Sequence, residues 1–132
     1  MEILFTHRET TELIRQRTGK DVDLMMIDHK SIQVILNRKI LFVRPKVDVV
    51  IDKTIGYDVY IHYKAHTAGI VFGNELIHSW ILNNLSYIDV PEKGVAIVHL
   101  DKIPQLQGML EKVILRSISF ENDSISVYLG LK

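Results

Sequence analysis

The sequence has no cysteine and no excess of charge of either sign, and each of these deficits excludes a class of protein. Without cysteine, the chain has no disulfide, no thiolate nucleophile and no thiolate-bound metal. Sixteen basic residues balance sixteen acidic ones, so the overall field does not attract a phosphate backbone. We therefore expect no nucleic-acid partner.

Long apolar runs are also missing. A membrane-spanning helix needs about 18 or more consecutive apolar residues, and Asn74, Glu75 and His78 interrupt the most apolar stretch of this chain. The first residues lack the basic start and the apolar run of a secretory signal. We expect no transmembrane segment and a cytoplasmic location, with the cell envelope as the alternative if a leader has been removed.

The composition that remains is that of a folded domain. Hydrophobic residues make up 47% of the chain and charged residues 24%, which is too apolar for a disordered chain. A chain of 132 residues fits one domain that buries a single core. We expect residues 1–132 to form this one domain.

Two short helices are predicted from their ends. Thr6 with Glu9 three residues later has the spacing of a capping box, which predicts a helix over residues 7–18. Asp101 is a candidate cap for a second short helix, in which Pro104 falls in the first turn and is tolerated there.

Apolar and polar residues alternate over much of the chain, and this spacing is typical of strands. From Val22 to Lys64 it predicts a meander, with one strand at about 39–44 and one running from Tyr57 to Lys64. The segment "VPEKGV" reads as a turn before a strand over about 95–100. The chain ends in two strands, "ILRSISF" and "SISVYLGLK".

The stretch "AHTAGIVFGNELIHSWILNNL" predicts a helix over residues 67–85 that is apolar around most of its circumference. One flat sheet face does not cover so wide a surface. We therefore expect an α+β fold, in which a curled antiparallel meander sheet wraps a central apolar helix and two further short helices lie outside.

No catalytic or cofactor motif is present. His62 and His66 are four residues apart, a helical metal-ligand spacing, but the alternation there indicates a strand. Asp48 and Asp52 share one strand face and read best as solvated charges, although general acid–base chemistry is conceivable. We expect no catalytic residues, no metal and no cofactor; the minority hypothesis is a hydrolase that uses His62, His66 or Asp58.

Basic residues gather around one predicted hairpin: Arg38, Lys39, Arg44 and Lys46. Such a cluster suits an anionic surface or an acidic partner, but it is more often a solvated turn.

In order along the chain, "TTELI", the strand meander, the apolar helix, "VPEKGVAIVHLDKIP" and the terminal "ISFENDSISVYLGLK" resemble the tubular lipid-binding superfamily, typified by the bactericidal/permeability-increasing protein, and its small bacterial relatives. The resemblance implies a long curled sheet around a helix and an apolar channel that holds lipid tails. The family's bacterial members are often exported, whereas this sequence shows no leader.

Together, these features predict a non-catalytic binding protein for a lipid-like or other hydrophobic ligand. The candidate groove residues are Phe72, Leu76, Trp80 and Tyr63. One alternative is a homo-oligomeric or protein-interaction module without a small-molecule ligand. Another is that the fold covers the apolar helix by itself and binds nothing there.

Overall fold

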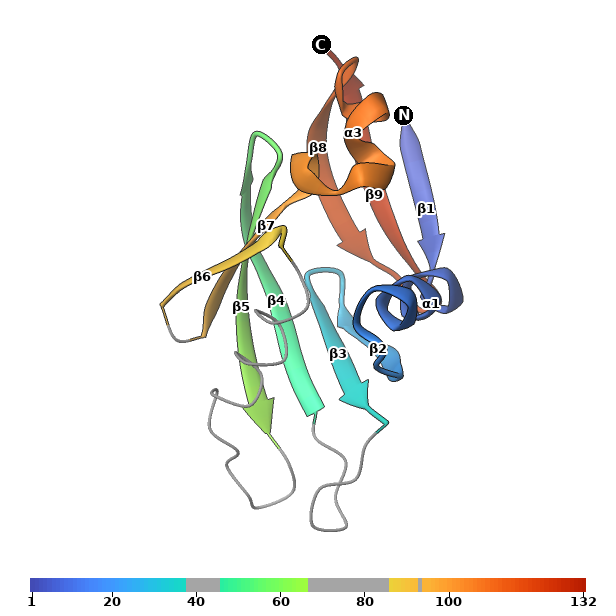
Figure 1. The fold of residues 1–132 in the computed structure, drawn as a ribbon, viewed down its shortest axis with the longest axis vertical. Helices are drawn as coiled ribbons and strands as arrows, with labels where there is room; N and C mark the ends of the chain where they lie inside the picture. The colour runs from blue at the N-terminus through green and yellow to red at the C-terminus, as the bar shows by residue number, and fades with distance from the viewer. Residues whose placement is uncertain (38–45, 67–85, 93) are drawn as a thin grey trace.

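A computed structural model of the chain describes residues 1–37, 46–66, 86–92 and 94–132 (Figure 1). This part of the chain is mostly β-structure, arranged as two antiparallel sheets with minor helices. None of its helices has the length and apolar content needed to cross a membrane.

The larger sheet has six strands, in the spatial order β2-β3-β4-β5-β7-β6. Every neighbouring pair is antiparallel. Its strands are β2 (Val22–Asp28), β3 (Ser31–Leu36), β4 (Lys46–Ile55), β5 (Asp58–His66), β6 (Ile88–Glu92) and β7 (Val95–His99).

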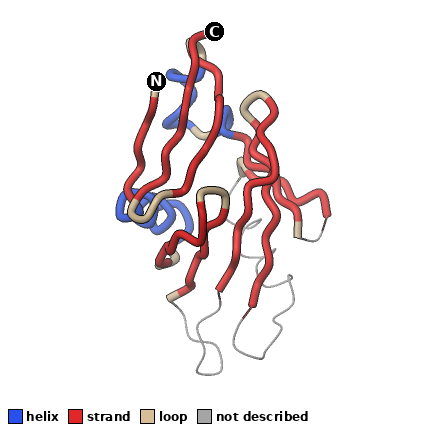
Figure 2. Tube along the Cα trace, turned by 180° about the vertical axis from the view of Figure 1, so that it is seen from behind, coloured by secondary structure: helices blue, strands red, loops and turns tan. Residues whose placement is uncertain are grey.

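The smaller sheet has three strands in the order β1-β9-β8, and it brings the two ends of the chain together (Figures 1 and 2). The Met1 amino group donates a hydrogen bond to the carbonyl oxygen of Leu129, at 2.9 Å. Its strands are β1 (Glu2–Thr6), β8 (Val113–Phe120) and β9 (Ser124–Leu131), and the helices are α1 (His7–Thr18), the 3₁₀ turn η1 (Leu100–Lys102) and α3 (Pro104–Leu110).

Local chemistry fixes the ends of α1 as predicted. The Thr6 hydroxyl accepts a hydrogen bond from the Glu9 N–H, and the Glu9 carboxylate accepts one from the Thr6 N–H, which completes the capping box. Gly19 ends the helix in the left-handed region, at φ 71°. The predicted helix over 7–18 is confirmed.

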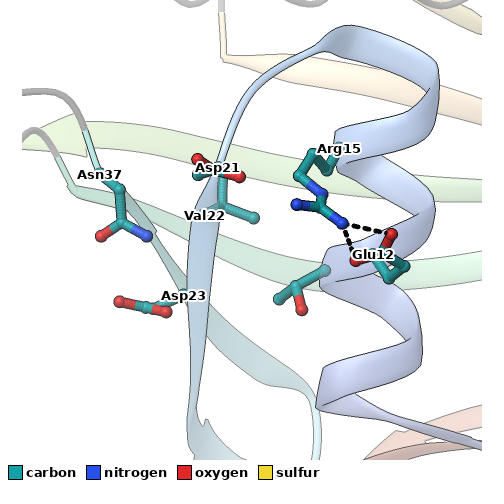
Figure 3. Close-up of a pocket in the computed structure, with 7 residues that line it drawn as sticks. Glu12, Arg15, Asp21, Val22, Asp23 and Asn37 are labelled. Carbon is teal, nitrogen blue, oxygen red and sulfur yellow. Dashed lines mark hydrogen bonds and ion pairs between the residues drawn. The ribbon is translucent and has the colours of Figure 1, made fainter.

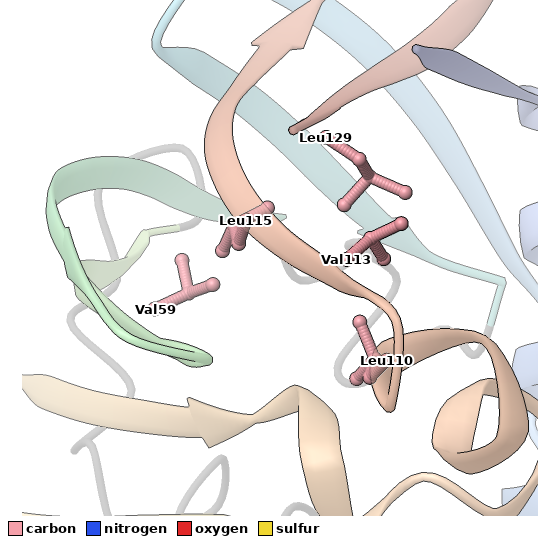
Figure 4. Packing of buried hydrophobic residues seen from close by; sticks show 5 residues of the cluster. All are labelled: Val59, Leu110, Val113, Leu115 and Leu129. Atoms are coloured by element: carbon pink, nitrogen blue, oxygen red, sulfur yellow. The ribbon is translucent and has the colours of Figure 1, made fainter. Parts of the chain in front are cut away.

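The two sheets pack together through one face of the larger sheet, which we call the inner face and which carries Val59 and Ile61 of β5. Around Val59 lie Leu110 of α3, Val113 and Leu115 of β8 and Leu129 of β9, all buried (Figure 4). Tyr57 links α3 to β8 in this core, because its hydroxyl lies 2.7 Å from both the Leu110 and the Val113 carbonyl oxygens.

The predicted curled sheet is wrong. The chain has two separate antiparallel sheets and no curled sheet in its described part, so the α+β arrangement of a sheet wrapping a central helix is contradicted. Alternation predicts which residues share a face, but it does not set which strands pair or whether a sheet bends. The predicted central helix, residues 67–85, and the predicted strand at 39–44 lie outside the described residues.

Other differences are local. Residues 2–6, to which the sequence analysis gives no element, form β1. Pro91 lies in β6 rather than in a turn, which an edge strand tolerates because one side of its backbone needs no partner. Asp101 lies in η1 and does not cap α3, whose N-cap position is Ile103. The strand after Gly94 and the two terminal strands are confirmed.

Candidate functional site

The inner face of the larger sheet carries a second apolar cluster, which we call the Tyr63 surface. Its buried members are Val47, Tyr63, Ala65 and Ala96, and the partly buried residues packed against them are Val34, Val49, Ile61, Ile88 and Val90. All of these belong to the larger sheet. Thus, among the described residues, the smaller sheet covers the Val59 part of the inner face but contributes nothing to the Tyr63 surface.

Strand register produces this surface. In β4 and β5, Val47 lies opposite Ala65 and Val49 lies opposite Tyr63, so their side chains share one face. Tyr63 is only 5% exposed, and its hydroxyl has no hydrogen-bond partner among the described residues. A buried hydroxyl without a partner costs about 1–3 kcal/mol, so this group marks a place where a polar atom of a ligand would be favourable.

The opposite, outer face of the larger sheet carries a charged group that we call the His99 cluster: Asp58, Asp89, His99 and Asp101. Asp58 begins β5 and lies opposite His99 at the end of β7. The His99 Nδ1 atom lies 2.6 Å from Asp58 Oδ1, and its Nε2 atom lies 2.6 Å from Asp89 Oδ2 in β6. A carboxylate only accepts hydrogen bonds, so a ring that donates to both must be protonated.

Electrostatics favour that protonated form. The hydrogen bond with Asp58, followed by that with Asp89, raises the pKa of His99 above its usual value, while partial burial of the ring acts in the opposite direction. The His99 side chain is 17% exposed, compared with 66% for Asp89. The ring is therefore shielded, whereas the Asp89 carboxylate faces solvent.

Asp101 completes the cluster from the 3₁₀ turn that follows β7. The turn is closed by a hydrogen bond from the Ile103 N–H to the Leu100 carbonyl, and the Leu100 N–H donates to the Tyr57 carbonyl. Asp58, His99 and Asp101 each offer one donor atom, and these three atoms lie within 4.8 Å of one another. This combination of one imidazole and two carboxylates is one that can hold a metal ion.

A surface pocket of about 260 Å³ lies between α1 and β2 (Figure 3). Arg15 and Glu12 form an ion pair at its wall. The remaining lining is Thr11, Asp21, Val22, Asp23 and Asn37. The lining is polar and carries three carboxylates, so it does not suit the hydrophobic ligand expected from the sequence.

The structure separates the residues of the hydrolase hypothesis. Asp58 forms an ion pair with His99, whereas His62 Nε2 lies 3.7 Å from Asp52 Oδ2. Asp58 and His62 are four residues apart in one strand, which is about 13 Å. The His66 side chain lies outside the described part, as do Arg38, Lys39 and Arg44 of the basic cluster.

Of the four predicted groove residues, the structure describes one. Tyr63 is buried on the inner face, while Phe72, Leu76 and Trp80 lie outside the described residues. The sequence analysis missed Asp89 and His99, and assigned Asp101 only a capping role. Val95 and Ile97 share the face of His99, so alternation does not mark that face as polar, and only the order β5-β7-β6 brings Asp89 and His99 together with Asp58.

Comparison with known proteins gives no family for this chain. No family model, no curated protein and no solved structure matches it. The resemblance to the tubular lipid-binding superfamily stays a prediction.

Proposed function

We propose that the protein is a non-catalytic binding protein, in which the Tyr63 surface contacts an apolar or lipid-like ligand. The observation that carries this proposal is the extent of the inner face. Its apolar rows continue through Val49, Tyr63 and Val90, beyond the part on which the smaller sheet packs. Contiguous apolar side chains with a few polar groups are typical of ligand sites.

The Tyr63 hydroxyl supplies the polar group. Apart from Tyr63, the side chains of the Tyr63 surface are aliphatic and form no hydrogen bonds, so they do little to orient a ligand. A ligand with an apolar body and one polar atom would pack against Val49 and Ala65 and hydrogen-bond to the hydroxyl; because Tyr63 and Ala65 are buried, this surface must open before the ligand binds. Phe72, Leu76 and Trp80 are proposed as further contacts, on the basis of the apolar pattern of 67–85.

A fluorescent fatty acid provides the test. We expect it to bind the freshly purified full chain saturably and to be displaced by unlabelled fatty acid, and we expect native mass spectrometry to show a bound mass. Absence of both signals would contradict the proposal.

A matched pair of tyrosines locates the site. Tyr63→Phe keeps the ring and removes the unpaired hydroxyl, so we expect it to raise the free energy of unfolding by about 1 kcal/mol and to weaken binding of the fatty acid several-fold. Tyr60→Phe is the control, because Tyr60 lies in the same strand on the outer face, with Lys53 Nζ 5.1 Å from its ring. Equal effects of the two variants on fatty-acid binding would place the ligand elsewhere.

One observation favours the second candidate, a homo-oligomeric module. On the outer face and its edge, Met25 and Ile27 of β2 and Val50 of β4 are each more than a third exposed. Exposed apolar side chains on β2 and β4, which β3 separates, suit a symmetric contact between two copies. Light scattering over the micromolar range separates the candidates: a strict monomer excludes this one, and Val50→Lys should dissociate a dimer without altering the Tyr63 surface.

A further inference from the structure

We propose that Asp58, His99 and Asp101 bind a divalent first-row transition metal ion, with Asp89 as the residue that positions the His99 ring. This site lies on the outer face of the larger sheet, so it is independent of the Tyr63 surface and of the function proposed for that surface.

The first step of the argument is the position of the ligands. Asp58 and His99 are register partners at the ends of two paired strands, and Asp101 follows two residues later in η1. Their donor atoms lie within 4.8 Å of one another. Ligand atoms around an ion with bonds of about 2.0–2.2 Å are about 3–4 Å apart, so His99 Nδ1 and Asp58 Oδ1, which are now 2.6 Å apart, would separate slightly as the ion replaces the ring proton between them. The exposed side chain of Asp101 can close this difference by rotation.

The second step is the orientation of the imidazole. A metal-bound histidine usually donates its other ring N–H to a carboxylate, which fixes the tautomer and aims the ligating nitrogen. In this structure the Nε2 side of His99 is held by Asp89, at 2.6 Å. That contact leaves Nδ1 on the side of the ring that faces the Asp58 carboxylate.

The third step is charge. Three carboxylates surround one imidazole, so the cluster carries a net negative charge whether the ring is protonated or neutral. Among the described residues, Asp58 and Asp89 each form an ion pair with the His99 ring, and neither pairs with a lysine or an arginine. A divalent ion that replaces the ring proton would compensate this charge more fully.

The donor set also indicates which ions are bound. One imidazole nitrogen with two carboxylate oxygens suits zinc, cobalt, nickel or manganese, whereas magnesium and calcium prefer oxygen ligands alone. The cluster supplies three protein ligands, which leaves room for water or another group on a four-coordinate ion.

Calorimetric titration of Zn²⁺ into the chelator-treated full chain tests the proposal. We expect one saturable site, and we expect Mg²⁺ at the same concentration not to compete. Asp101→Asn should lower the Zn²⁺ affinity at least 10-fold, and Asp89→Asn should lower it about 10- to 100-fold, as loss of an outer carboxylate does in known sites. Circular dichroism of both variants confirms that they fold.

Asp52→Asn is the matched control. Asp52 also lies beside a histidine of the outer face, His62, but these two residues form only a pair. The variant should bind Zn²⁺ as tightly as the parent chain. In ¹⁵N spectra of the imidazoles, Zn²⁺ should shift Nδ1 of His99 and leave His62 unchanged.

Three results would overturn the proposal. They are the lack of saturable Zn²⁺ binding, unchanged affinity in Asp101→Asn, and equal losses in Asp101→Asn and Asp52→Asn. The last result would mean that zinc binds surface histidines in general.

Discussion

At the residue scale, the neighbours of a side chain set its chemistry more than its type does. His62 and His99 both lie on the outer face of the larger sheet, yet His62 lies 3.7 Å from one carboxylate while His99 lies 2.6 Å from each of two. A doubly paired and shielded ring is held in one orientation. This difference makes His99 the residue on which the proposed metal site depends.

The paired carboxylates make the stability of the metal-free protein depend on pH. The folded-state pKa of His99 is raised, so its contribution is fully present below the unfolded-state pKa, about 6.5, and is lost as the pH rises through the folded value. We expect the free energy of unfolding to fall as the pH rises above about 6.5. Urea unfolding at a series of pH values, with a chelator present, measures this.

Asp89→Asn is the comparison for this prediction. The substitution removes the charged hydrogen-bond acceptor that, after Asp58, contributes most to the raised pKa of His99, and it keeps the shape of the side chain. The dependence of stability on pH should be smaller in the variant than in the parent. An unchanged slope would mean that other groups control the pH dependence.

At the element scale, backbone conformation explains why two glycines differ. Gly56 turns the chain between β4 and β5 at φ 61°, whereas Gly108 lies within α3. A Cβ atom added at either position meets nothing within 4 Å, so space does not distinguish them. What distinguishes them is the left-handed conformation, which costs a residue with a Cβ about 1–2 kcal/mol.

Replacing each glycine by alanine tests this directly. We expect Gly56→Ala to lower the free energy of unfolding by about 1 kcal/mol. We expect Gly108→Ala to raise it by about 0.5–1 kcal/mol, because alanine favours a helix. Chemical denaturation of the two variants and the parent gives both values, and effects of the same sign would refute the explanation.

Local patterns were sufficient to predict many elements. The capping box at Thr6 fixed the start of α1, and strict alternation gave most of β5 and β9. They failed for β1, in which Ile3, Leu4 and Phe5 are consecutive apolar residues without alternation. They also failed at Pro91, because only the order of strands shows that β6 is an edge.

At the scale of the whole molecule, the core around Val59 joins the two sheets. Leu115 of β8 is buried there, while Leu131 at the end of β9 is 81% exposed. Removing buried methyl groups loses transfer energy and leaves a cavity, whereas an exposed leucine loses little.

We therefore expect Leu115→Ala to cost about 3 kcal/mol and Leu131→Ala less than about 0.5 kcal/mol. Residues 1–132 are predicted to be one domain, so both sheets should lose protection together in Leu115→Ala. Amide hydrogen exchange along β4, β5, β8 and β9 measures this. Loss of protection in the smaller sheet alone would indicate two independent units.

The sequence by itself determined the elements whose causes are local. Alternation assigned Tyr63 and Asp58 to opposite faces of one strand, and capping residues placed α1, because these effects act over a few neighbouring positions. Only the tertiary structure decided that the strands form two sheets rather than a curled one, and that β7 lies between β5 and β6. Pairing joins residues far apart in the chain, such as Asp58 and His99, and no short-range pattern encodes which partners meet.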